Sequence, residues 1–309
     1  MAMTGTGQVS SSTGAFEQMA YFALRSNPLY EMIADVRSTA QTHNGASVTF
    51  DIYDNMVPAT TALAQAVDVT PVQLADTTAV VTLVEYGNAV ETTAKLRGTS
   101  FLNVDADAAN IIGYNMVDSL DQVVAAVAAG GTNEILPTGR AATVNIIAGD
   151  TITADQTRTA AAKLRTASAP GFENGNYVGM IHPNVAFDLR SQTAVTDVIA
   201  FQIRQDGQAV RNGSIGTWGG VEFIENPRAH IQAGAGAAGI DVYDTVIAGR
   251  QALAKGFSRA PGFGEQPQIV YGPTTDYLRR FVSVGWYHLC GYSRFREACL
   301  QRVESASSL

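Results

Sequence analysis

The chain has 309 residues, 46% of them hydrophobic and 16% charged, so it can build a large core and does not resemble a disordered protein. Its 28 Asp and Glu against 20 Lys and Arg give a formal net charge of −8. The cations are scattered along the sequence, which argues against a nucleic-acid-binding module that reads base sequence. It does not exclude a surface that merely encloses nucleic acid. Two cysteines, Cys290 and Cys299, are too few for a disulfide scaffold or a zinc ribbon. We expect a soluble protein of a reducing compartment, with no membrane partner.

The first 45 residues read as an N-terminal arm. Residues 1–15 are small and polar, which is typical of a tail that is either mobile or ordered by a partner. Apolar residues then recur at helical spacing over 16–23 and again over 29–36. This spacing predicts two short helices.

Residues 46–100 are expected to form an extended β arm. Val48, Phe50 and Ile52 alternate with polar residues, as in a half-buried strand. Residues 78–86 are apolar on both strand faces and therefore need a cover on each side. Two interpretations stay open: another copy of the chain supplies one cover, or the segment is an ordinary internal hairpin. On the first interpretation, the candidate inter-subunit contacts are Val48, Phe50, Val80, Val84 and Tyr86.

Residues 103–131 predict one long helix of about 26 residues. Asp105 and Asp107 lie near its start, where the helix dipole favours carboxylates, and a glycine pair ends it. The residues expected on its buried, fold-determining face are Ile112, Met116, Leu120, Val123 and Val127. Asp118 and Asp121 are three residues apart and could imitate a catalytic acid pair, but a solvated helix face is the preferred interpretation.

The rest of the chain mixes short helices and strands, so the predicted fold class is α+β. Weak strands are expected around 141–147. Thr153 and Gln156 form a capping box that opens a helix with a buried stripe of Ala160, Ala161 and Leu164. Residues 177–181 read as a buried strand that runs into His182 and then Pro183, at the first position of a helix. Further strands are expected over 220–224, 241–248, 268–271 and 281–303.

No catalytic, cofactor-binding or metal-binding site is predicted. Residues 234–239 read GAGAAG, which matches the GxGxxG dinucleotide fingerprint, but a strand pattern follows where the fingerprint needs a helix. A flexible loop is the preferred interpretation, and a nucleotide-binding oxidoreductase stays a remote alternative. The four histidines, His43, His182, His230 and His288, lack the spacing of metal ligands.

Four stretches resemble the major capsid proteins of tailed phages with the HK97-type fold, and within them the coliphage N4 type. They are VEYGNAVE at 84–91 with Lys95 and Leu96 after it, YVGMIHPNVAFDL at 177–189, NGSIGTWGGVEFI at 212–224, and VSVGW at 282–286. Together they touch most of the chain from about residue 46 to residue 300, in the family's order.

The resemblance implies a non-enzymatic shell subunit with five regions. They are an N-terminal arm (1–45), an E-loop (46–100), the spine helix of a peripheral domain (101–131), an axial domain (132–240) and a return to the peripheral domain (241–309). The family forms hexamers and pentamers of an icosahedral virion capsid around double-stranded DNA, assembled in the host cytoplasm, with portal, scaffold or decoration proteins as further partners. An encapsulin-like protein nanocompartment is the alternative with the same fold.

Overall fold

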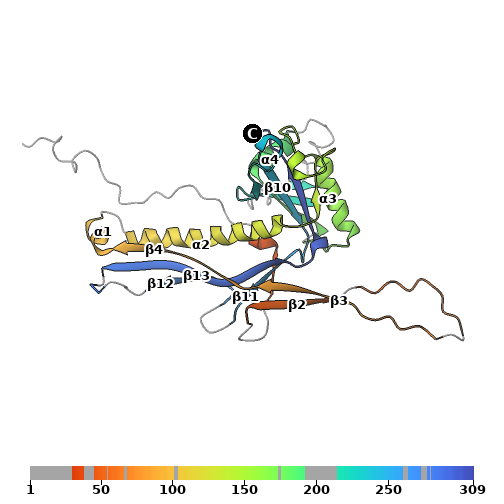
Figure 1. Ribbon diagram of the computed structural model, residues 1–309, viewed down its shortest axis with the longest axis horizontal. Coiled ribbons are helices and arrows are strands. Elements are labelled where there is room, and N and C mark those ends of the chain that lie inside the picture. Colours follow the sequence, from red (N-terminus) through yellow and green to blue (C-terminus); the bar gives the residue numbers. More distant parts are fainter. Residues whose placement is uncertain are drawn as a thin grey trace, which may run out of the picture. The chain divides into compact units, whose positions relative to one another are not determined.

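The computed structural model (Figure 1) describes residues 30–37, 45–53, 55–65, 68–100, 104–172, 175–191, 214–259, 264–272, 277–278 and 280–309. The described chain divides into two compact units. Unit 1 comprises Gly87–Met116 and Gln268–Tyr287. Unit 2 comprises the segments up to Tyr86, Val117–Pro267 and His288–Leu309.

Helix α2 (Val104–Ala129) is the long predicted helix, and its 26 residues match the expected length. Its first half belongs to unit 1 and its second half to unit 2. Ile112 and Leu120 are buried as predicted, but Met116, Val123 and Val127 are only partly buried. In the second half the core positions are instead Val124, Ala125 and Ala128. The predicted stripe takes a step of three from Leu120 to Val123, whereas the buried positions continue in fours from Leu120 to Val124 and Ala128. At 3.6 residues per turn each step of four advances about 40° around the axis, so the buried stripe winds around the helix.

Unit 2 is built around a seven-stranded mixed sheet with the order β5-β14-β10-β6-β8-β7, in which β9 also pairs with β10. Its strands are β5 (Glu134–Ile135), β6 (Tyr177–Ile181), β7 (Ser214–Trp218), β8 (Val221–Glu225), β9 (Ile231–Gln232), β10 (Val242–Ala248) and β14 (Leu300–Ser305). Strands β10 and β14, which come after residue 240, lie in the same sheet as β6 and β8. Sheet membership therefore does not change at residue 240, and the predicted boundary there stays a prediction.

Two helices of unit 2 form as their local signals predict. Helix α3 (Ala154–Thr166) opens with the expected capping box, in which Thr153 accepts from the Gln156 amide and its own amide donates to Gln156 Oε1 at 2.7 Å. Ala160, Ala161 and Leu164 are buried. Helix α4 (Pro183–Arg190) has His182 as its N-cap, whose Nδ1 accepts from the Asn184 amide at 3.2 Å.

A second sheet has the order β1-β11-β13-β12, with β4 also paired to β13. Its elements are β1 (Ala34–Arg37), β4 (Val84–Thr93), β11 (Leu253–Phe257), β12 (Gln268–Tyr271) and β13 (Phe281–Arg294). In unit 1, β4 leads into helix α1 (Ala94–Thr99), and the indole of Trp286 on β13 donates to Asn115 Oδ1 of α2 at 2.9 Å. A third, two-stranded sheet pairs β2 (Ser47–Tyr53) with β3 (Asp76–Thr82).

Several predicted elements differ in the structure. The predicted helix over 29–36 is a single 3-10 turn, η3 (Tyr30–Ile33), followed by β1, and the helix predicted over 16–23 lies outside the described residues. The segment 141–147 holds a 3-10 turn, η4 (Thr143–Asn145), and no strand. Two further 3-10 turns among the described residues are η6 (Ala237–Gly239) and η7 (Glu297–Cys299). Residues 78–86 are not one strand, because the ladder breaks at Leu83 between β3 and β4.

Candidate assembly surfaces

The inner face of the β2–β3 hairpin is covered by its own chain. Val48 and Val81 lie opposite each other in the register and are almost fully buried. Phe50 packs on the cluster of Val81, Ala254 and Phe295, with its ring edge-on to Phe295 at a centroid distance of 6.1 Å. Val48 therefore has no surface left for a neighbour, whereas Phe50 is only partly buried. The assignment of Val48 as an inter-subunit contact is corrected, because strand alternation places it on the covered face, opposite Val80. The assignment of Phe50 stays a prediction.

The outer face of the hairpin is open. Val80 is 50% exposed and Val84, at the start of β4, is 45% exposed. Tyr53 is also exposed on this face, whereas Tyr86 is half-buried, and burial raises the pKa of its phenol. The structure thus divides the two apolar faces of residues 78–86 into a face that the chain covers and a face that it leaves open. Val80, Val84 and Tyr86 stay candidate inter-subunit contacts.

The connection between β2 and β3 extends this open surface. Every described residue from Asn55 to Ala75 is exposed, and none belongs to a helix or strand (Figure 1). The large apolar side chains among them are 56% to 85% exposed: Met56, Val57, Leu63, Val69, Val72 and Leu74. Sequence reasoning did not single out these residues. The sequence feature that could have identified them is the presence of apolar residues around Pro58 and Pro71. Proline breaks strand pairing without making the segment polar.

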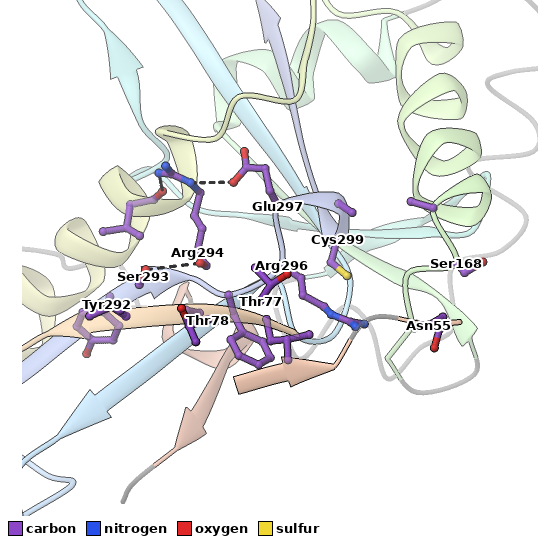
Figure 2. Close-up of a pocket in the computed structure, with 17 residues that line it drawn as sticks. Asn55, Thr77, Thr78, Ser168, Tyr292, Ser293, Arg294, Arg296, Glu297 and Cys299 are labelled. Carbon is purple, nitrogen blue, oxygen red and sulfur yellow. Dashed lines mark hydrogen bonds and ion pairs between the residues drawn. The ribbon is translucent and has the colours of Figure 1, made fainter. Parts of the chain in front are cut away.

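A cavity of about 820 Å³ in unit 2 is lined by β3, the end of β13 and η7 (Figure 2). Arg294 is held there by Glu297 at 2.9 Å and by the carbonyl of Val127 at 3.3 Å. The guanidinium of Arg296 donates to Gln251. Burial raises the pKa of the Cys299 thiol, so it stays protonated and unreactive at neutral pH. The cavity contains no paired nucleophile and base, and its arginines form their hydrogen bonds and ion pair within the chain.

Several polar groups that could suggest chemistry are structural. Asp121 is 1% exposed and accepts from the Tyr30 amide at 2.6 Å and from Asn226 Nδ2 at 3.0 Å. The interpretation of Asp118 and Asp121 as a solvated pair is therefore wrong for Asp121. Asp118 forms an ion pair with Arg228 at 2.9 Å.

The histidines are dispersed. His182 caps α4, His230 Nδ1 lies 2.6 Å from Asp244, and His288 is buried on β13. His43 lies outside the described residues. Across the described ranges, no three His, Cys, Asp or Glu side chains are arranged to hold a metal ion. In the same residues, no helix is long and apolar enough to cross a bilayer.

The GAGAAG segment is not a dinucleotide site. It begins after β9, contains the short turn η6, and leads into β10 instead of a helix. Its backbone is held in place by hydrogen bonds from Gly234 to Asp241 and from Ala237 to the Ile146 carbonyl, both 2.8 Å long. A dinucleotide fingerprint needs a helix N-terminus for the pyrophosphate, and none follows here.

Comparison with known proteins agrees with a chain that presents open apolar surfaces. A family model described as phage capsid protein matches residues 13–309. The chain belongs to this phage capsid protein family. This capsid protein is accordingly a structural component of the virion capsid and not an enzyme. No curated protein matches it in sequence.

Solved capsid structures resemble this capsid protein over nearly its full length. The capsid of Ralstonia phage GP4 has 13% identity and a TM-score of 0.80, covering 96% of each chain. The capsid of cyanophage Pam1 has 14% identity and a TM-score of 0.73, covering 97% of this chain and 98% of that one. The capsid of cyanophage P-SCSP1u has 16% identity and a TM-score of 0.70, covering 99% of both. The HK97-type fold is thereby confirmed, whereas the resemblance to the coliphage N4 type stays a prediction.

Proposed function

We propose that this capsid protein assembles into hexamers and pentamers of an icosahedral shell that encloses double-stranded DNA, and that it does so in the host cytoplasm. The observation that carries the proposal is the open apolar surface of the arm, defined as residues 46–86. Val80 and Val84 are about half exposed, and the loop over 55–75 adds six exposed large apolar side chains. A soluble monomer rarely leaves so many of them without a partner.

A closed shell accounts for such a surface because each copy meets its neighbours through unlike patches. Contacts of this heterologous kind close into rings when the rotation allows it, and each contact is repeated in every copy. A modest free energy per contact therefore suffices for a stable lattice. The net charge of −8 suits a shell that encloses DNA without binding it tightly, because a strongly cationic inner surface would bind phosphates tightly.

We further propose which region of the chain forms each part of the capsid fold. The arm and β4 correspond to the E-loop, α2 to the spine of the peripheral domain, and the seven-stranded sheet with α3 and α4 to the axial domain. Because β10 and β14 belong to that sheet, the axial region includes parts of the chain beyond residue 240.

The proposal is tested by expressing the protein alone and with the other head proteins of its phage, then measuring particle mass by multi-angle light scattering. Megadalton particles or capsomers are expected. Particles purified from infected cells should protect double-stranded DNA from nuclease, whereas protected cargo protein in place of DNA would favour an encapsulin-like compartment. A 32.6 kDa species at all concentrations and salts would contradict the proposal.

A further inference from the structure

The cavity of about 820 Å³ contains a cation that the chain leaves without an acidic partner. All of its lining residues belong to unit 2, and two of them are arginines. Arg294 forms an ion pair with Glu297 at 2.9 Å, so its charge is balanced. Arg296 is half-buried, and its guanidinium donates to the neutral side chain of Gln251 at 3.4 Å. No carboxylate of the described residues pairs with Arg296.

The carboxylate that lines the cavity is already used by other donors. Glu297 Oε1 accepts from the amide and the hydroxyl of Thr132, and Glu297 Oε2 accepts from Arg294. The charge of Arg296 acts within the cavity, because it opposes the burial that raises the pKa of the Cys299 thiol. A guanidinium has five N–H donors in a planar fork that matches the oxygens of a carboxylate or a phosphate. Arg296 therefore has donors left for an anion.

Neutral donors line the same cavity. The side chains of Asn55, Thr78 and Ser168 are exposed there and form no hydrogen bond with a described residue. In Figure 2 the Arg296 side chain extends away from Arg294, toward the side of the cavity on which Asn55 and Ser168 are drawn. The apolar part of the lining includes Ile52, Val127 and Ala167. The cavity thus combines one cation, several neutral donors and an apolar wall.

Ser168 has an unusual backbone conformation for a residue with a side chain. Its φ of 54° lies in the left-handed region, just after α3, and its amide donates to the Arg165 carbonyl at 3.0 Å. Glycine is the usual residue at this position after a helix, because a Cβ is strained there. A serine in this place brings a hydroxyl to the cavity at a cost in backbone energy. Strain of this kind indicates that the hydroxyl is used.

We propose that the cavity binds a small organic phosphate monoester, with Arg296 and Ser168 holding the phosphate. A phosphate monoester offers three strong acceptor oxygens, which suit a guanidinium together with neutral donors better than the two oxygens of a carboxylate do. Sites for small organic ligands have volumes of about 300–1,000 Å³, so a free phosphate ion would leave most of this cavity empty. The organic part of the ligand fills the remainder, beside the apolar wall. The site is independent of the assembly proposed above.

Isothermal titration calorimetry of the full-length protein tests the ligand class. The probes are adenosine monophosphate, glycerol 3-phosphate, inorganic phosphate and adenosine, which lacks the phosphate. We expect at least one monoester to bind more tightly than inorganic phosphate, and adenosine not to bind. Tighter binding of adenosine monophosphate would identify a nucleotide, and tighter binding of glycerol 3-phosphate a polyol phosphate. The proposal is overturned if no phosphate binds, if inorganic phosphate binds as tightly as both esters, or if adenosine binds as tightly as its phosphate.

Variants of the two phosphate-holding residues test the site. Arg296→Gln should weaken binding at least about tenfold, because hydrogen bonds to a charged group are lost. Arg296→Lys keeps the charge but not the planar fork, so its affinity should be intermediate. Lys163→Gln removes a charge from an exposed position of α3 outside the lining, and this control variant should bind as the wild type does.

Ser168→Gly separates a ligand-binding role from a structural one. Glycine relieves the left-handed strain, so the thermal midpoint of the unliganded protein should stay the same or rise, while the affinity falls several-fold. Circular dichroism would verify the fold of each variant. If Arg296→Gln does not fold, Arg296→Lys and Ser168→Gly decide the question. Wild-type affinity in the folded variants of both residues, or an equal loss of affinity in the Lys163→Gln control, would overturn the site.

Discussion

Two neighbouring valines of β3 allow folding and assembly to be separated by the same substitution. Val81 is completely buried, so Val81→Asp places a carboxylate in the cluster with Ala254 and Phe295. An unpaired buried charge costs several kcal/mol, comparable to the 5–15 kcal/mol that stabilises a typical domain. Val80 is 50% exposed, so Val80→Asp forfeits about half of a valine's burial, or roughly 1 kcal/mol.

We therefore expect Val81→Asp to lower the urea midpoint sharply or to yield insoluble protein. Val80→Asp should keep native circular dichroism and a midpoint near that of the wild type, while the assembled fraction measured by sedimentation falls strongly. Val80→Thr, which keeps the size of the side chain without a charge, serves as the matched control and should assemble. If Val80→Asp unfolded the subunit as thoroughly as Val81→Asp, the outer face would be ordinary core and the intermolecular interpretation would be wrong.

Three further outcomes follow from buried polar groups. Asp121→Asn should cost about 1–3 kcal/mol in the free energy of unfolding, because its new amide would face the donor of Asn226; an unchanged urea midpoint would contradict the geometry. Burial, with the charge of Lys255 adding to it, lowers the pKa of His288 from 6.5 to about 4. The unfolded chain then binds more protons, so the stability from this group is complete above pH 6.5 and falls as the pH drops toward 4, by about 3 kcal/mol in total. His288→Gln should remove this part of the dependence of the unfolding free energy on pH. Equal slopes of unfolding free energy against pH in the wild type and the variant would refute the prediction. Cys290 and Cys299 are buried free thiols, so shells boiled without reductant should run as monomers on a gel; a ladder of higher bands would show cross-links.

Local signals in the sequence were sufficient for the elements that depend on neighbouring residues. The capping box at Thr153 and the proline at 183 specify the starts of α3 and α4, because each satisfies backbone groups within one turn. The length of α2 followed equally well from its periodicity and the glycines at its end. These features do not depend on what packs against the helix.

Tertiary partners decided the elements that sequence reasoning missed. Whether Val123 or Val124 faces the core depends on which residues of unit 2 pack against α2. The periodicity of the helix alone does not give this information. Asp121 is buried because Tyr30 and Asn226, 91 and 105 residues away, donate to it. Such long-range pairs leave no local pattern. Likewise, two apolar faces at 78–86 indicated two covers, but only the structure shows which face the chain itself covers.

The direct test of an arm that acts between copies is an electron cryo-microscopy map of the assembled particle at side-chain resolution. Our account predicts a closed shell in which the loop over 55–75 and the exposed side chains of Val80 and Val84 lie against a neighbouring copy. A map in which each arm folds back onto its own subunit, or in which these valines face solvent in the finished shell, would contradict it.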